Sequence, residues 1–437
     1  MLHQDPRKLK LDLTKFHKSA NELEVKYGLP RHIDFCTKCV ISNQRPSSGI
    51  EQNHKISTKK ETIRFHKDGI CDACKVSESK NIGIDWAKRE HELRILCDKY
   101  RSRNGSYDCL VPGSGGKDSF VQSWILRYEF QMNPLTVTWA PNLYTDWGRI
   151  NHTKWIDSGF DNYLFTPNGK VRRILTRLAV ENLFHPFQPF IIGQKSFAPK
   201  LAQKLSIPLI FYGENEAEYG NSSADMESPI RQSRYHSTLQ DKISFISGVE
   251  VNQLKHDYSL SDQDLYPYLS STIDDLEKAK IEVHYLGYYR KWHPQENYYF
   301  AVENGGFVPS PQRTAGTYSK YVSIDDKIDD LHFYTTFIKF GIGRATYEAA
   351  QEIRSGDLER DEAVNLVKRY DGEYPERFID ELFSYLSLPE SEFGDVSKKF
   401  EEPTIDREYF DALTNKFRSP HIWKFEDGEW ALRKTVI

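Results

Sequence analysis

The sequence predicts an α/β protein built around a doubly wound parallel β-sheet. Between residues 107 and 212, short apolar runs of strand length alternate with segments of helical period. A glycine-rich turn joins the first of these runs to the first helix, as in many α/β proteins that bind phosphate. With 437 residues, 38% of them hydrophobic and 28% charged, the chain is expected to fold into two or three domains.

The expected elements follow in order along the chain. Strands are expected at Tyr107–Pro112, Pro134–Ala140, Asn162–Thr166 and Ile207–Tyr212. The accompanying helices are expected at Ile84–Tyr100, from Lys117 to about Gln131, and at Ile150–Ser158, Lys170–Leu183 and Phe197–Leu205. Further helices, separated by glycines, are expected at Ile328–Phe340, Arg344–Ser355 and Asp361–Tyr370.

A glycine-rich loop (residues 113–119, GSGGKDS) follows the first predicted strand. Glycines let backbone N–H groups approach an anion closely, and a helix N-terminus adds its dipole and free N–H groups. We therefore predict a nucleotide-phosphate site, in which Lys117 neutralises phosphate charge and Asp118 holds Mg²⁺. The other phosphate-binding candidates are Ser114, Gly115, Gly116 and Ser119. The alternative is a tight structural turn, and the spacing is not that of a Walker A loop.

Polar residues also follow the fourth predicted strand. Ligands of doubly wound sheets bind at the carboxyl ends of the strands, where the strand order changes. Gly213 is therefore expected beside the glycine-rich loop, as part of the nucleotide site. Glu214, Asn215 and Glu218 are candidates for metal or ammonia handling. An ordinary acidic loop is the alternative.

Four of the six cysteines form two CxxC pairs, Cys36/Cys39 and Cys71/Cys74, separated by 31 residues. Two such turns can complete a tetrahedral site, so we predict a structural zinc ion, with an iron–sulfur cluster or no metal as alternatives. His54 and His66 lie between the pairs and are expected to be exposed loop residues. The two remaining cysteines, Cys97 and Cys109, are expected in the core.

Charge and hydropathy exclude several functional classes. The net charge is −4, and no dense basic stripe is present, so a nucleic-acid partner is not expected. No run of 18 apolar residues is present, which argues against a membrane span. The N-terminus lacks the apolar core of a signal peptide, so a cytoplasmic location is expected.

The chain divides into five predicted parts. Residues 1–33 form a loose extension, in which Leu9, Leu11, Leu13 and Phe16 can dock on the body. Residues 34–80 form a zinc-ribbon-like module, and residues 81–220 the nucleotide-binding domain. Residues 221–325 break the alternation and contain YYRKWHPQENYYF, which suits either a sugar or nucleotide or a tyrosine-rich core or interface. Residues 326–437 are mainly helical.

Several strings together carry a family resemblance: CTKCV with GICDAC, GSGGKDS, IPLIFYGENEAEYGN, and WHPQENYY followed by GTYSKYVSIDDKID and FGIGRATYEAAQEIR. Over about Cys36–Asp371, the chain resembles the N-acetyl sugar amidotransferases of bacterial surface-glycan synthesis, within the PP-loop ATP pyrophosphatase superfamily. That family includes enzymes that form acetamidino derivatives of pseudaminic or legionaminic acid, and of O-antigen mannuronic acids. The chain departs from the family in its longer loop between the cysteine pairs and in its N-terminal extension.

The resemblance implies ATP-dependent conversion of an acetamido group to an acetamidino group through an O-adenylyl imidate. Lys117, Asp118, Glu214 and Asn215 would then be catalytic, and the substrate would be an acetamido sugar, expected in nucleotide-linked form. The implied sugar-contacting residues are Tyr288, Trp292, Gln295, Asn297, Tyr318, Ser319 and Lys320. Because neither remaining cysteine sits on a nucleophile turn, ammonia is expected from a separate glutaminase subunit.

Two other functions compete with this interpretation. A tRNA-modifying thiolase or lysidine-type enzyme also joins such a loop to cysteine pairs, and it adenylates a base carbonyl. Against it stand the net charge of −4 and the lack of a basic stripe. A zinc-ribbon interaction protein with a degenerate nucleotide fold is the non-enzymatic alternative, and the intact GSGGKDS string argues against it.

Overall fold

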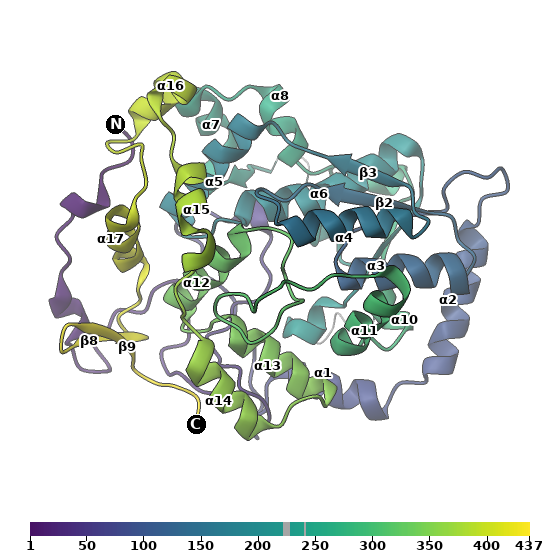
Figure 1. Cartoon of the computed structure of the whole chain (residues 1–437), viewed down its shortest axis with the longest axis horizontal. Coiled ribbons are helices and arrows are strands. Elements are labelled where there is room, and N and C mark those ends of the chain that lie inside the picture. The colour runs from purple at the N-terminus through teal and green to yellow at the C-terminus, as the bar shows by residue number, and fades with distance from the viewer. Residues whose placement is uncertain (222–227, 240–241) are drawn as a thin grey trace.

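A five-stranded parallel sheet forms the centre of the molecule (Figure 1). The computed structural model describes residues 1–221, 228–239 and 242–437. The strand order is β3-β2-β1-β4-β7, and every neighbouring pair is parallel. The strands are β1 (Cys109–Pro112), β2 (Pro134–Trp139), β3 (Asn162–Phe165), β4 (Leu209–Tyr212) and β7 (Glu282–Tyr285). The predicted parallel α/β sheet is confirmed.

Helices cover both faces of this sheet. In β1, Cys109 and Val111 pack with α2 (Trp86–Tyr100) and α3 (Lys117–Trp124), whereas Leu110 packs with α6 (Gln188–Leu205). Successive side chains of a strand point to opposite faces, so a continuous apolar run such as CLV marks a strand buried on both sides. The other helices of this region are α4 (Asp146–Asp157) and α5 (Gly169–Leu183).

The strand order reverses at β1. The chain proceeds from β1 to β2 and β3 on one side, and then returns to place β4 and β7 on the other side. The loop that follows β1 therefore opens at the crevice where doubly wound sheets bind ligands.

The sheet extends beyond the segment that the sequence predicts. β7 lies in the part expected as an insertion, residues 221–325, and pairs with β4 along its whole length. It follows the short helix α9 (Ile273–Lys278). After it, α10 (Leu286–Tyr289) packs on α2, and α11 (Pro294–Gly305) packs on α3. The remaining elements of this part are β5 (Phe245–Ile246), β6 (Val249–Glu250), α7 (Val251–Tyr258) and α8 (Asp262–Leu265). Residues 222–227 and 240–241 lie outside the described residues.

The C-terminal part is helical, as predicted, and ends in a β-hairpin. Its helices are α12 (Ile328–Phe340), α13 (Arg344–Ser355), α14 (Arg360–Tyr370), α15 (Ile379–Leu386), α16 (Glu390–Phe393) and α17 (Arg407–Phe417). The hairpin consists of β8 (Trp423–Glu426) and β9 (Glu429–Leu432). None of the helices in the described ranges is long and apolar enough to cross a membrane.

The first 33 residues are not a loose extension. The N–H groups of Leu2 and His3 donate to the carbonyl of Lys399, at 2.7 and 3.0 Å, and Figure 1 shows the N-terminal segment lying along the C-terminal one. Phe16 is buried in the core of the C-terminal helices, whereas Leu9 and Leu11 are exposed. The extension folds because this apolar anchor offsets the entropy of ordering it.

Candidate active site

The glycine-rich loop has the tight geometry that a phosphate site requires. Gly115 has φ +88°, and a Cβ atom there would lie 2.6 Å from the Cα of His152 in α4. At Gly113, a Cβ atom would lie 2.2 Å from the Cβ of Ser119. Gly116 precedes α3 and provides no side-chain cap, so the first N–H groups of that helix are available to an anion.

Charged side chains surround this loop. Lys117 is buried, and its Nζ lies 2.6 Å from Oδ2 of Asp118, whose Oδ1 accepts a hydrogen bond from Asn297 at 3.1 Å. Glu214 follows β4 and accepts a hydrogen bond from the hydroxyl of Tyr219 at 2.6 Å. Burial and the charge of Asp118 raise the pKa of Glu214 to about 7, although Lys117 opposes the shift. A carboxylate with this pKa can exchange a proton near neutral pH.

The loop lies in the wall of a cavity of about 710 Å³, within the size range of small-molecule sites. One wall consists of Glu214, predicted to be catalytic, and of the residues predicted for the nucleotide site, which are Ser114, Gly115, Gly116, Lys117, Asp118, Ser119 and Gly213. The other walls come from the cysteine module, from α6, and from α12 with α13. The sheet, the N-terminal module and the C-terminal helices thus share one cavity.

An acidic segment before and within α12 lies beside the loop at this cavity, and the hydroxyl of Ser114 hydrogen-bonds to Asp325. Asp325 and Asp329 line it, and burial raises the pKa of both carboxyl groups. Asp326 accepts hydrogen bonds from three backbone N–H groups and anchors the segment to the turn after β2. Gly148 of α4 allows this segment to lie against the helix, since a Cβ atom at that position would lie 2.7 Å from the Cα of Asp325.

Sequence reasoning missed these aspartates as site residues. The string SIDDKIDD was noted only for its family resemblance, and acidic residues at the start of a helix are common because they favour the helix dipole. Their number could have indicated a site, since four aspartates in six residues exceed what helix capping requires.

The predicted catalytic residues are only partly brought together. Lys117, Asp118 and Glu214 lie at the cavity. Asn215 is buried outside the lining, and its Oδ1 accepts a hydrogen bond from the N–H of Ala217 at 2.9 Å, which caps a short 3-10 helix. Glu218 also lies outside the lining and forms an ion pair with Lys80.

The residues predicted to contact a sugar lie around the cavity rather than in its lining. In the first stretch, Trp292 is buried beneath the loop after β4, Tyr288 stacks on an arginine side chain, and Gln295 is half-buried. Asn297 reaches the site through its hydrogen bond to Asp118. Their contact with a sugar stays a prediction.

The second predicted sugar-binding stretch, Tyr318–Lys320, is also outside the lining. Tyr318 donates its hydroxyl to Glu352 of α13 at 2.6 Å, Ser319 is buried, and Lys320 is exposed. The next residue, Tyr321, does line the cavity, and its ring stacks on that of Tyr298 at 4.1 Å. Which residues of this stretch line the cavity depends on tertiary packing and could not be predicted from their spacing in the sequence.

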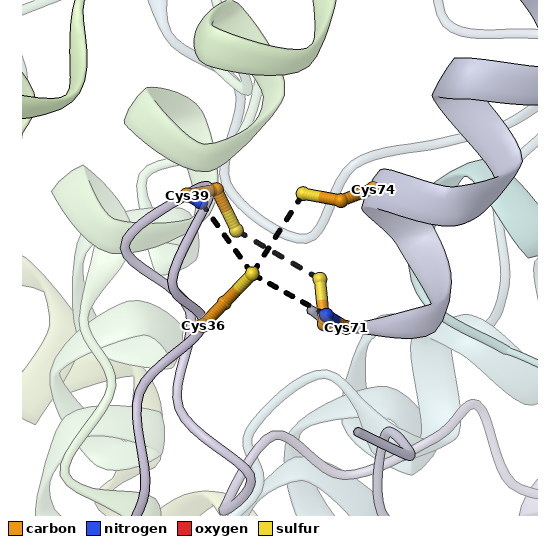
Figure 2. A group of neighbouring side chains, drawn as sticks. All are labelled: Cys36, Cys39, Cys71 and Cys74. Atoms are coloured by element: carbon orange, nitrogen blue, oxygen red, sulfur yellow. Dashed lines mark hydrogen bonds between the residues drawn. The ribbon is translucent and has the colours of Figure 1, made fainter. Parts of the chain in front are cut away.

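The four paired cysteines form one buried cluster, as Figure 2 shows. Cys36 and Cys39 come from one loop, and Cys71 and Cys74 from the start of α1 (Asp72–Ile82). The Sγ atoms of Cys36 and Cys74 lie 3.9 Å apart, and those of Cys39 and Cys71 lie 3.8 Å apart. Zn–S bonds of about 2.3 Å place two ligands of a tetrahedron about 3.8 Å apart. The residues therefore fit a single zinc ion, whereas an iron–sulfur cluster needs more widely spaced sulfurs.

Backbone N–H groups add to the thiolate character of this cluster. Those of Lys38, Cys39 and Cys71 all point at Sγ of Cys36, at 3.4, 3.4 and 3.3 Å. Hydrogen bonds of this kind stabilise a metal-bound thiolate. The ion would cross-link the loop to α1 and supply folding free energy, because the described sulfur ligands complete its coordination.

The cysteine module forms part of the cavity wall. Val40, Ile41 and Ala73 pack with Ala349 and Ala350 of α13, and Ile41 and Ala73 also line the cavity. His54, expected to be exposed, is instead buried. Its Nδ1 lies 3.3 Å from the carboxylate of Glu51 and away from the sulfur cluster. Cys97 and Cys109 are buried in the core, as predicted.

Comparison with known families adds one finding. Residues 315–436 match the family model described as "LPS biosynthesis protein WbpG-like, C-terminal domain". The match covers well under half of the chain and includes α12 and α13, which line the cavity. No curated protein matches the chain. The match supports a relationship between this part of the chain and a family of glycan-biosynthesis proteins.

Replacement of Gly115 by alanine is expected to weaken ATP binding at least about tenfold. The backbone cost at positive φ is about 1–2 kcal/mol, and the methyl group also collides with α4. Isothermal titration with MgATP measures the change. Gly169→Ala is the matched control, because a Cβ atom at Gly169 meets nothing within 4 Å. Equal affinities for the wild type and Gly115→Ala would argue against phosphate binding by this loop.

The purified protein is expected to contain about one zinc ion per chain, bound by the four clustered cysteines. Elemental analysis should show loss of zinc in the double variant Cys39→Ser/Cys74→Ser and retention in Cys97→Ala, whose thiol lies in the core. Chelation should lower the melting temperature, since the ion stabilises only the folded module. A metal-free protein with an unchanged melting temperature would contradict this assignment.

Proposed function

We propose that the protein is an ATP-dependent amidotransferase that converts the acetamido group of a surface-glycan sugar to an acetamidino group. One observation carries the proposal: the glycine-rich loop and the segment that matches a lipopolysaccharide-biosynthesis family line the same cavity. The parallel sheet, with this loop after its central strand, also supports a fold of the PP-loop ATP pyrophosphatase type.

The reaction requires activation because an amide carbonyl has no leaving group that ammonia can displace. In the proposed first step, the acetamido oxygen attacks the α-phosphorus of ATP, and the bond to pyrophosphate breaks. The product is an O-adenylyl imidate. Ammonia then adds to its carbon, and AMP departs with the original oxygen, so that nitrogen replaces oxygen in the sugar.

The residues of the loop suit the first step. N–H groups at the start of α3 and the ammonium of Lys117 would stabilise the negative charge on the departing pyrophosphate. Asp118 would hold a magnesium ion, whose charge would further offset that of the phosphates. Positioning of the acetamido oxygen in line with the α-phosphorus is the other contribution of the cavity.

Glu214 suits the second step. Addition of ammonia leaves a proton on the new nitrogen, and a carboxylate with a pKa of about 7 can accept it. Asp325 and Asp329, whose pKa values are raised by burial, line the same cavity and would accept hydrogen bonds from the N–H groups of the amidinium product.

The ammonia would come from a separate glutaminase subunit. A glutaminase of the cysteine type needs a reactive thiolate. All six cysteines are described: four form the metal cluster, and burial raises the pKa of Cys97 to about 12 and that of Cys109 well above its usual range. These thiols are too weakly acidic to serve as nucleophiles.

Pyrophosphate release tests this function against its alternative. With MgATP and ammonium chloride, release should depend on an acetamido sugar nucleotide, with AMP formed in step and a product about 1 Da lighter. A tRNA-modifying enzyme would adenylate a base carbonyl in the same cavity, so release that depends on bulk tRNA alone would replace the proposal. The family match favours the sugar.

Replacement of Glu214 by glutamine is expected to slow amidine formation about 10²–10⁴-fold. In the wild type, the rate at fixed free ammonia should rise with pH through about 7, as Glu214 loses its proton, and this rise should vanish in the variant. Pyrophosphate release and product mass, measured from pH 5.5 to 8.5, provide the readout. Glu303→Gln, at an exposed position of α11, is the control. An unchanged pH profile in Glu214→Gln would exclude this role.

A further inference from the structure

A second charged region lines the cavity beyond the glycine-rich loop. It contains Arg231, Lys195 of α6 and one carboxylate, Glu216. Its charged groups are distinct from those at the loop. Burial, Arg231 and Lys195 govern the pKa of Glu216, whereas burial, Asp118 and Lys117 govern the pKa of Glu214. The cavity thus has two separate cationic regions.

Arg231 is held rigidly but incompletely paired. Its backbone N–H donates to the carbonyl of Val283 in β7, and its guanidinium lies over the ring of Tyr212, 4.4 Å from the centroid. Nη2 donates to Oε1 of Glu216 at 2.6 Å. Although only 4% of the residue is exposed, Nε and Nη1 have no hydrogen-bond partner among the described residues. Buried guanidinium N–H groups are normally satisfied, so this pattern indicates a missing acceptor.

Lys195 adds a second cation, and no described carboxylate forms an ion pair with it. The ring of Tyr235 lies 5.8 Å from its Nζ, and no described residue forms a hydrogen bond or ion pair with that ammonium. The next carboxylate, that of Glu51, is engaged by His54 at 3.3 Å. Lys195 is half-buried and Arg231 is buried, and among the described residues these two cations of the region share one carboxylate, so a further anion would stabilise both.

Among the residues that the structure describes, the groups around Arg231 and Lys195 do not supply the missing negative charge. Oε2 of Glu216 accepts a hydrogen bond from Asn221 at 2.9 Å, so both carboxylate oxygens are engaged. His236 is buried near Arg231 and Lys195, and burial with their charges lowers its pKa to about 3, which keeps it neutral. Arg45, a further cation in the lining, lies over the ring of Tyr347, 5.9 Å from its centroid, and donates to the carbonyl of Pro46 at 3.2 Å.

We propose that Arg231 and Lys195 form a second anion site, which binds a carboxylate or phosphate group of the substrate that shares the cavity with ATP. The assignment rests on the proposed function in assuming such a second substrate. Glu216 orients the guanidinium through Nη2, and the anion accepts hydrogen bonds from its remaining N–H groups and from the lysine. The site selects acidic acetamido sugars over neutral ones.

Binding of matched probes tests the site without turnover. N-acetylneuraminate is compared with its uncharged methyl ester, and N-acetylglucosamine 1-phosphate with N-acetylglucosamine, by titration calorimetry in the presence of a non-hydrolysable ATP analogue. At least one charged probe should bind the wild type about tenfold or more tightly than its neutral partner. Lys195→Met should remove most of this preference and leave the affinity for the ATP analogue unchanged. Arg231→Lys, which keeps the charge but not the planar donors, should reduce it as well.

Lys204→Met is the matched control, since Lys204 lies on the same helix, outside the cavity lining. A preference that survives in both site variants would overturn the proposal, as would a wild type that binds neither charged probe more tightly. Weakened binding of the ATP analogue alone would assign the region to the phosphates of ATP and would also overturn it. Selective binding without pyrophosphate release would contradict the amidotransferase and leave the anion site standing.

Discussion

Two backbone approaches to α4 hold the candidate active site together. The loop after β1 passes so close to His152 that only glycine fits at position 115. One turn earlier on the same face of the helix, the segment before α12 passes so close to Gly148 that the Cα of Asp325 would collide with a side chain there. Because one rigid helix carries both contacts, the distance between the phosphate loop and the acidic wall is set by backbone packing. Flexible side chains have little influence on it.

The C-terminal helices depend on a single buried arginine for the same alignment. Arg344 is fully buried; it forms ion pairs with Asp330 and Glu348 and donates to the carbonyls of Val322 and Ser323. Loss of such a residue would leave carboxylates and carbonyls buried without partners, a change that typically costs about 3–5 kcal/mol. This arginine therefore fixes the segment that precedes α12 and forms ion pairs with the carboxylates around it.

Much of this architecture could be predicted because it depends on local patterns. The apolar runs, the glycine-rich loop and the predicted C-terminal helices depend on periodicity and on backbone sterics, which short stretches of sequence record. The cysteine cluster was predictable because metal ligands must be paired at fixed spacing. β7 was not predicted, because its four residues, EVHY, include a charged residue and a histidine. Their presence in a strand is explained by tertiary partners, Lys99 for Glu282 and Tyr289 for His284.

The lining of the cavity was less predictable than its loop. The Tyr288–Tyr299 stretch has the composition of a sugar site, yet none of its aromatic rings lines the cavity, and Tyr299 is exposed. Arg231 and Lys195 do line it, although they stand in sequence contexts without any recognisable motif. Their role arises from segments that meet only in the folded chain. Composition indicates which chemistry a chain can offer, but the topology decides which of these groups face a ligand.

The position of Ala73 between two of the cysteine ligands has a thermodynamic consequence. Ala73 lines the cavity, while its neighbours Cys71 and Cys74 belong to the metal cluster, so a ligand and the ion would engage residues of the same helical turn. Two ligands that order the same turn favour each other's binding by the same factor in both directions. A filled cavity would thus retain its metal more tightly than an empty one, and the structural ion would report on occupancy.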